Sequence, residues 1–199
     1  GAPPVPAAER PLQYLTFWLG SEVFGMDIRT VREIIQAGPM TALPLMPPFV
    51  RGVINLRGSV VPVVDLNARF GRPASTLGKK SCVVVFDTLR QGERVELGLL
   101  VDAVSEVIKI APADIEAPPD FGSVLRRDFI QGIGKVGQRF VVLLEPGVAF
   151  TALIDAQREQ ALHDGARAED IELALGARRT AHRDSGAVLQ AIGQRWIQF

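Results

Sequence analysis

Residues 49–66 read FVRGVINLRGSVVPVVDL, and this stretch decides the fold of the chain. Two runs rich in β-branched residues flank the tetrapeptide Asn55-Leu56-Arg57-Gly58. Such runs, interrupted by Asn and Gly, favour a strand, a tight turn and a second strand, so the stretch predicts a β-hairpin. Arg57 stands at the tip, where the turn does not require a cation. Because loops held by a rigid scaffold often carry function, Arg57 is a candidate recognition residue.

The composition excludes several classes of protein. The chain has 199 residues, of which 47% are hydrophobic, so it can bury the core of one or two domains. Its 22 basic and 22 acidic residues cancel, so no long-range field attracts it to nucleic acid or to an anionic membrane. The longest apolar runs are far shorter than the roughly 20 residues of a membrane-spanning helix. The single cysteine, Cys82, cannot form an internal disulfide, which makes the cytosol the expected compartment.

Short segments typical of strands follow one another over most of the chain. The pattern predicts strands at 12–19, 23–28, 81–87 and 94–101, and a second hairpin at 129–144. We expect a turn-like or helical segment at 30–35 and a short helix, capped by Asp65, that ends at Phe70. Residues 111–128 are rich in proline and are expected to be irregular. The predicted fold class is therefore mainly β, with short helices.

An internal repeat divides the chain into two similar halves. When Gly25 is placed over Gly98, FGMDIRTVREII at 24–35 aligns with LGLLVDAVSEVI at 97–108. Further along, VVPVVDL at 60–66 aligns with FVVLLEP at 140–146. The chain thus contains two copies of a strand–strand–turn–hairpin unit, which predicts two small antiparallel barrels.

The repeat also serves as an internal control on candidate site residues. Glu33 recurs as Glu106, which favours a role in the fold for both glutamates. Arg57 does not recur, because its aligned position is Gly137. The fold can therefore build this hairpin without an arginine, which strengthens a functional interpretation of Arg57.

The apolar residues beside Glu33 leave two interpretations open. Val31, Ile34 and Ile35 either all pack into the barrel, or they leave an apolar groove that is rimmed by Glu33 and Arg57. A groove of this kind would suit a helix of a partner protein.

Catalytic and metal sites find little support in the sequence. The histidines, His163 and His182, lie beyond the predicted barrels, whereas general acid–base catalysis most often uses histidine. No cluster of Cys and His has the spacing of metal ligands, and no Lys-Ser/Thr follows the glycines at 132–137. Cys82 lies in a predicted strand and is expected to pack as a small hydrophobic residue. We expect a protein without catalytic activity, cofactor or metal.

The linked motifs resemble those of a known family. FGMDIRTVREII at 24–35, followed by FVRGVINLRGSVVPVVDL at 49–66, is similar to the CheW-type adaptors of bacterial chemotaxis. The later LGLLVDAVSEVI and the predicted hairpin at 129–144 fit the same pattern in order, so the resemblance covers about residues 10–155. It implies a fold of two intertwined, five-stranded SH3-like barrels, which agrees with the internal repeat.

The resemblance also implies a function and a site. Proteins of this type are scaffolds without catalytic activity that couple the cytoplasmic tips of transmembrane chemoreceptors to the histidine kinase CheA, through its regulatory domain. The family's receptor-facing positions fall here on Val31, Glu33, Gly52 and Arg57. The implied location is cytoplasmic, with recruitment to membrane-bound receptor arrays. We expect Arg57→Glu to weaken receptor coupling while the melting temperature stays nearly unchanged.

Other functions are compatible with parts of the same pattern. The same fold could serve a different chemosensory pathway, with surface motility or another output, or could be a CheW-like part of a larger kinase. An SH3-like barrel that binds nucleic acid is disfavoured by the neutral charge.

Three parts of the chain are expected. Residues 1–10 lack the features of a signal peptide and are read as a flexible leader. Residues 11–155 form the CheW-like domain with its two barrel subdomains. Residues 156–199 are an extension of unknown role, for which an amphipathic terminal helix, a disordered segment and a non-native fusion stay open.

Overall fold

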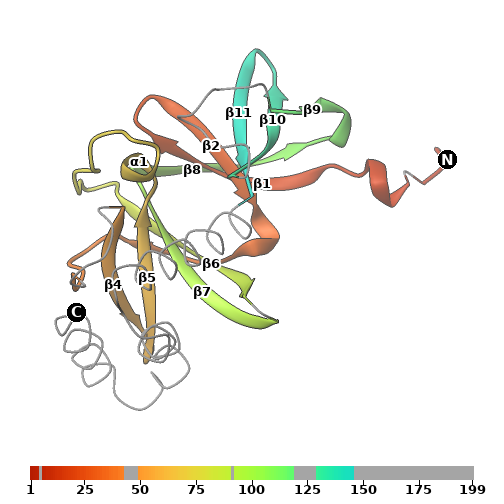
Figure 1. Ribbon diagram of the computed structural model, residues 1–199. Helices are drawn as coiled ribbons and strands as arrows, with labels where there is room; N and C mark the ends of the chain where they lie inside the picture. The colour runs from red at the N-terminus through yellow and green to blue at the C-terminus, as the bar shows by residue number, and fades with distance from the viewer. Residues whose placement is uncertain (5, 43–48, 91, 119–128, 146–199) are drawn as a thin grey trace, which may run out of the picture.

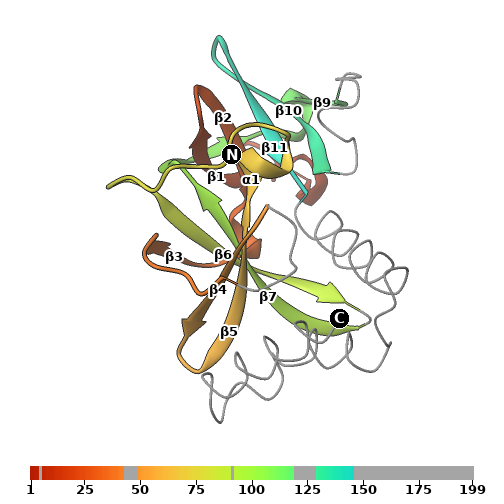
Figure 2. The same cartoon turned by 60° about the vertical axis from the view of Figure 1, so that its left-hand side comes forward.

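The structure is a computed structural model that describes residues 1–4, 6–42, 49–90, 92–118 and 129–145. One sheet, barrel A, contains β1 (Leu12–Leu19), β2 (Glu22–Asp27), β8 (Ala103–Ile110), β9 (Ile115–Glu116), β10 (Ile130–Val136) and β11 (Arg139–Leu144). The other sheet, barrel B, contains β3 (Val31–Gln36), β4 (Val50–Leu56), β5 (Ser59–Asp65), β6 (Cys82–Arg90) and β7 (Glu93–Val101). The strand orders are β8-β1-β2-β11-β10-β9 and β3-β6-β7-β5-β4 (Figures 1 and 2).

The helices in the described part of the chain are short. Three are 3-10 turns, η1 (Ala7–Glu9), η2 (Ile28–Thr30) and η3 (Pro112–Asp114), and one is a single α-helical turn, α1 (Leu66–Arg69). None of these described helices has the length and apolarity that crossing a membrane requires. As predicted, Asp65 caps α1, and its side chain accepts a hydrogen bond from Ala68 N. The mainly β fold class is confirmed.

Each barrel is built from both copies of the repeat. Barrel A takes β1 and β2 from the first copy and β8 to β11 from the second. Barrel B takes β6 and β7 from the second copy and β3 to β5 from the first. Two parallel ladders stand at equivalent places, where Gly25 pairs with Leu143 and Gly98 pairs with Val63. The alignment of Gly25 with Gly98 is thus confirmed in space, and the two barrels are intertwined.

A shared hydrophobic core joins the barrels. The largest cluster of buried residues contains side chains of both sheets, among them Phe17, Phe24 and Phe86, together with Leu66 of α1. Figures 1 and 2 both show α1 at the junction of the barrels. Each barrel also has a smaller cluster of buried residues of its own, one in barrel B and one in barrel A. The contact between the barrels is therefore part of the hydrophobic core. Because apolar burial is the main driving force of folding, this contact fixes how the two barrels pack against each other.

The prediction of a turn-like or helical segment at 30–35 was wrong, because β3 occupies residues 31–36. Val31 pairs with Phe86 and Glu33 pairs with Val85, so Arg32 is the extra residue of a β-bulge. The bulge places Val31 on the same face as Ile34, which pairs with Val84. Apolar residues three apart imitate the period of a helix, which explains the error.

Two other expectations are modified or lie outside the described residues. Residues 115–116 form β9, so barrel A has a sixth, two-residue strand where irregular chain was expected. The extension at 156–199 lies outside the described residues. Within the expected leader, residues 7–9 form the exposed turn η1.

Candidate functional site

The hairpin predicted at 49–66 is formed by β4 and β5, and Arg57 and Gly58 are the two residues of its turn. Their φ angles are 53° and 85°, and positive φ at both central residues is what a type I′ turn requires. Asn55 Oδ1 accepts a hydrogen bond from Gly58 N at 2.9 Å, which supports the turn. The Arg57 side chain is 76% exposed, so the hairpin presents it to solvent.

Glu33 and Arg57 meet where barrel B closes. Glu33 lies in β3, and Arg57 follows β4 in the turn of its hairpin. The strands β3 and β4 are the two edges of the five-stranded sheet. Arg57 Nη2 donates a hydrogen bond to Glu33 Oε2, and the two side chains form an ion pair. The structure thus brings together two of the four predicted site residues, from opposite edges of one sheet.

The backbone around position 52 requires a glycine. It is buried with φ 148°, and a Cβ at this position would lie 2.4 Å from Thr41 O. Thr41 forms an isolated bridge with Val53, so the chain before β4 lies directly against that strand. A side chain at Gly52 would push this segment away, which makes Gly52 a residue that shapes the site.

The apolar residues of β3 divide between the core and the surface. Val31 is half-buried and packs against the shared core, whereas Ile35 packs against the core of barrel B. Ile34 is 41% exposed. The interpretation in which all three residues pack into the barrel is therefore wrong for Ile34.

Barrel A carries an ion pair that corresponds to Glu33–Arg57. Glu106, the repeat partner of Glu33, lies 3.6 Å from Arg139, measured from Oε1 to Nη2. Sequence reasoning missed Arg139 because the residue aligned with Arg57 is Gly137, and the arginine comes two positions later. The ion pair recurs, whereas the arginine in the turn does not.

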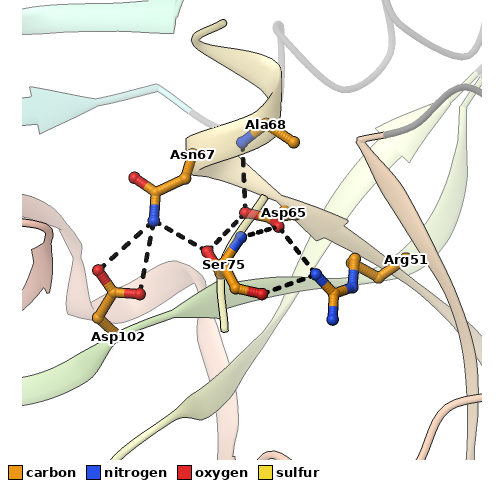
Figure 3. Close-up of polar contacts among 6 residues, drawn as sticks. All are labelled: Arg51, Asp65, Asn67, Ala68, Ser75 and Asp102. Carbon is orange, nitrogen blue, oxygen red and sulfur yellow. Dashed lines mark hydrogen bonds and ion pairs between the residues drawn. The ribbon is translucent and has the colours of Figure 1, made fainter. Parts of the chain in front are cut away.

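A polar network holds the base of the hairpin (Figure 3). Asp65, which is fully buried at the end of β5, accepts hydrogen bonds from Ser75 N and Ser75 Oγ, both at 2.8 Å. Arg51 of β4 pairs with Asp65 Oδ2 at 3.4 Å and donates to Ser75 O at 2.8 Å. These bonds tie both hairpin strands to the loop that follows α1, so the tip with Arg57 stands on a rigid base.

The same network reaches barrel A. Asn67 Nδ2 donates to Ser75 Oγ at 2.8 Å and to the carboxylate of Asp102 at 3.4 Å (Figure 3). Asp102 in turn accepts a hydrogen bond from Gly20 N at 2.6 Å, in the turn between β1 and β2. The carboxylates Asp65 and Asp102 therefore link the hairpin of barrel B to the first hairpin of barrel A.

The turn before β3 is held by Asp27 and Arg29. Asp27 Oδ1 accepts a hydrogen bond from Arg29 N at 2.9 Å, and Arg29 Nη2 lies 2.6 Å from Asp27 Oδ2. The side-chain hydrogen bond from Arg29 lowers the pKa of Asp27, although partial burial opposes the shift. The charged form of Asp27 therefore supports the start of the strand that carries Glu33.

Three further charged residues lie close to Glu33 in the sheet and were not predicted as site residues. Arg32 and Arg94 both pair with Asp87 Oδ2, at 3.2 and 3.5 Å. The length of the hairpin at 81–101, compared with its repeat partner at 12–27, is the sequence signal that could have revealed Arg94. Paired guanidinium and carboxylate groups on rigid strands can form charge-assisted hydrogen bonds with a partner.

Comparison with known proteins agrees with this geometry. Residues 13–152 match the model of the CheW-like domain. A chemotaxis protein CheW of Klebsiella aerogenes is 35% identical over 133 residues, which cover 67% of this chain and 78% of that protein. A probable chemotaxis protein CheW of Rhizobium etli is 37% identical over 140 residues, which cover 70% and 87% of the two chains.

A solved structure gives the same result. The crystal structure of the scaffolding protein TtCheW from Thermoanaerobacter tengcongensis matches with a TM-score of 0.62 and 35% sequence identity. The match covers 69% of this chain and 86% of that one. The chain therefore belongs to the CheW-like domain family and is a non-catalytic scaffold of chemotaxis.

Proposed function

We propose that this chain is an adaptor that couples chemoreceptors to the histidine kinase CheA, and that Glu33 and Arg57 lie in its receptor-binding surface. Family membership supports the adaptor role. The observation that carries the site is Arg57 itself, a cation that is 76% exposed on a turn with positive φ.

Arg57 is not explained by the stability of the hairpin. A left-handed conformation costs a residue other than glycine about 1–2 kcal/mol. An exposed ion pair, such as the one with Glu33, offsets only about 0–1 kcal/mol. Gly137 has φ 61° at the equivalent turn and avoids the cost. Since glycine would serve the fold at least as well, binding to a partner is the better reason for an arginine.

The other two residues have supporting roles in this proposal. Val31 packs against the shared core and sets the position of the strand that carries Glu33. Gly52 allows Thr41 to approach β4 and so keeps the first strand of the Arg57 hairpin in place. Binding should therefore depend on Arg57 and Glu33 by direct contact, and on Val31 and Gly52 through the shape of the surface.

The partners in this proposal are the cytoplasmic tip of a chemoreceptor and the regulatory domain of CheA. The protein would act in the cytoplasm and would be recruited to membrane-bound receptor arrays. Both partners can be made as soluble fragments, so each contact can be measured separately.

The test is calorimetric titration of the full chain with the regulatory domain of CheA, and then with a soluble fragment of the receptor tip, both from the same organism. We expect micromolar or tighter binding of the CheA domain. Arg57→Glu should weaken receptor binding by about tenfold or more, because it reverses a charge in the interface. Arg139→Glu, which changes the corresponding ion pair of barrel A, is the matched control.

Two results would contradict the proposal. A folded wild-type chain that binds neither fragment would rule out the adaptor role with these partners. A large fall in the melting temperature of Arg57→Glu would show that Arg57 is structural, since an exposed substitution should change stability by only about 0.5–1 kcal/mol.

A further inference from the structure

The hairpin of β6 and β7 is longer than its repeat partner. Phe17 pairs with Phe24 in the first copy, and Phe86 pairs with Leu97 in the second. Beyond this point β1 and β2 form two further pairs, which end at Leu19↔Glu22, whereas β6 and β7 form four, which end at Arg90↔Glu93. At about 3.4 Å per residue, the second hairpin extends about 7 Å further.

The extension adds Arg94 to a set of charged residues on barrel B. Asp87 lies in the part of the hairpin that both copies share, and its Oδ2 atom holds Arg32 Nε at 3.2 Å and Arg94 Nε, which belongs to the extension, at 3.5 Å. Arg32 is the bulged residue of β3 and directly precedes Glu33, which pairs with Arg57. Ion pairs thus join Arg32 and Arg94 through Asp87, and join Arg57 to Glu33, the residue that follows Arg32 in β3. The three arginines, Arg57, Arg32 and Arg94, come from three different parts of barrel B. We call them the arginine row.

The arginine row faces outward and its carboxylates face inward. The three arginine side chains are 76%, 52% and 67% exposed in that order, whereas Glu33 is 32% and Asp87 is 16% exposed. A partner that approaches this surface meets guanidinium groups first. Leu89 pairs across the hairpin with Arg94 and is 68% exposed, so a large apolar side chain lies next to the cations.

These features contribute little to the stability of the fold. Exposed ion pairs contribute about 0–1 kcal/mol each, and a leucine that is 68% exposed keeps most of its apolar surface in water. The first hairpin of the repeat closes without the extension. A bulge beside a site commonly redirects a side chain, and here it places Arg32 between Glu33 and Asp87.

We propose that the arginine row and Leu89 bind one acidic, amphipathic helix of the partner, and that the extended hairpin determines which partner is accepted. This inference rests on the proposed function, because Arg57 is shared by both. Charge complementarity identifies the occupant: outward guanidinium groups select carboxylates, and Leu89 contacts the apolar stripe of the helix. The hairpin extension thus widens a site that begins at the Glu33–Arg57 pair.

The test compares variants of the full chain in titrations with the receptor-tip fragment. We expect the double variant Arg32→Glu/Arg94→Glu to bind about tenfold or more weakly, and to lose affinity less steeply as salt is raised, because fewer charge contacts remain. Leu89→Ser should weaken binding without changing the salt dependence. Arg139→Glu on barrel A should leave both quantities unchanged. The neutral variant Arg32→Gln/Arg94→Gln replaces the charge reversal if the latter fails to fold.

The outcomes separate this inference from the proposed function. If Arg57→Glu weakens binding but the folded double variant binds like the wild type, the arginine row has no part in the interface and the inference is wrong. If the double variant and Arg139→Glu weaken binding equally, the effect is one of overall charge, which also overturns it. If the wild type does not bind the fragment, the proposed receptor contact fails and this inference fails with it.

Discussion

Barrels A and B share one architecture, but among the described residues barrel B carries charged groups, Arg57 in its turn and Arg32 in its bulge, that have no counterpart in barrel A. Each barrel contains the third strand of one repeat copy, β8 in barrel A and β3 in barrel B, and each of these strands has a β-bulge. The glutamate of the strand forms an ion pair with an arginine of the following hairpin, Glu106 with Arg139 and Glu33 with Arg57. In barrel A the bulge is held by Thr16, whose hydroxyl bonds to both Glu106 O and Glu106 N.

The difference separates the requirements of the fold from those of function. Thr16 lies opposite its bulge, whereas the residue opposite the bulge in barrel B is Val85, which has no hydroxyl. The bulge of barrel B instead presents Arg32 to Asp87, and its hairpin places Arg57 where barrel A has Gly137. Features that occur in both barrels belong to the fold, and features confined to barrel B are candidates for binding.

The largest effect is expected at two glycines that occupy equivalent positions in the two barrels. A Cβ at Gly52 would lie 2.4 Å from Thr41 O, and one at Gly132 would lie 2.8 Å from Glu116 O. We expect Gly52→Ala to lower the free energy of unfolding by about 4 kcal/mol or more, and Gly132→Ala by about 2 kcal/mol, as measured by urea unfolding. Gly20→Ala, whose new Cβ meets open space, is the control and should cost about 1 kcal/mol. Equal effects at Gly20 and Gly52 would contradict the close approach of Thr41.

The second effect distinguishes the ends of the two hairpins. Asp65 is fully buried and holds Ser75, whereas Glu145, in the equivalent position, is exposed. Asp65→Ala leaves Arg51 without its carboxylate partner and the two Ser75 donors without their acceptor, and should destabilise the fold by about 3 kcal/mol. Glu145→Ala should change stability by about 0.5 kcal/mol or less in the same unfolding experiment. If Asp65→Ala lowered the free energy of unfolding only slightly, the network of Figure 3 would not support the hairpin.

A smaller effect is expected when the turn residues are exchanged. Arg57→Gly removes the energetic cost of a positive φ angle at a non-glycine residue, and it also loses an exposed ion pair. The free energy of unfolding should therefore rise or stay within about 1 kcal/mol of the wild type. Gly137→Arg should cost about 1–2 kcal/mol, because it introduces the strain into barrel A. Thermal unfolding of both variants checks this pair of signs. A marked loss of stability in Arg57→Gly would show that barrel B needs its arginine.

The smallest effect concerns the Asp27–Arg29 pair, which precedes β3. Arg29 lowers the pKa of Asp27 below the ordinary value of 3.8. The stabilisation is therefore present above 3.8 and is lost as the pH falls through the lower pKa of the folded state. Asp27→Asn should be slightly less stable than the wild type at neutral pH, and the gap should narrow in acid. A gap that is independent of pH would assign the effect to the cap alone.

Much of the fold could be predicted from local sequence. The hairpin at 49–66, the cap at Asp65 and the repeat that aligns Gly25 with Gly98 were all readable, because turn chemistry and β-branched runs act within a few residues. The strand at 31–36 was not, since the bulge at Arg32 gives its apolar residues a helical spacing. A single inserted residue was enough to hide the period of a strand.

The candidate site could be predicted only in part, for a different reason. Glu33 and Arg57 were identified from the residues and the family resemblance, and the structure brings them into contact. The partners Asp87 and Arg94 depend on the pairing of β3 with β6 and of β6 with β7. Cross-strand contacts of this kind are fixed by the register and by the bulge, which no local pattern reveals.

The exchange of strands between the repeats has a consequence for how such a chain could arise. A single copy of the repeat contains no complete barrel, because its first two strands belong to one barrel and its remaining strands to the other. A half-length ancestor could bury its strands only by entwining with a second copy of itself, as in a domain-swapped homodimer. Fusion of the two copies into one chain would allow the halves to diverge, so that a residue such as Arg57 could stand in one turn while glycine stays at the equivalent position 137, which a symmetric homodimer does not permit.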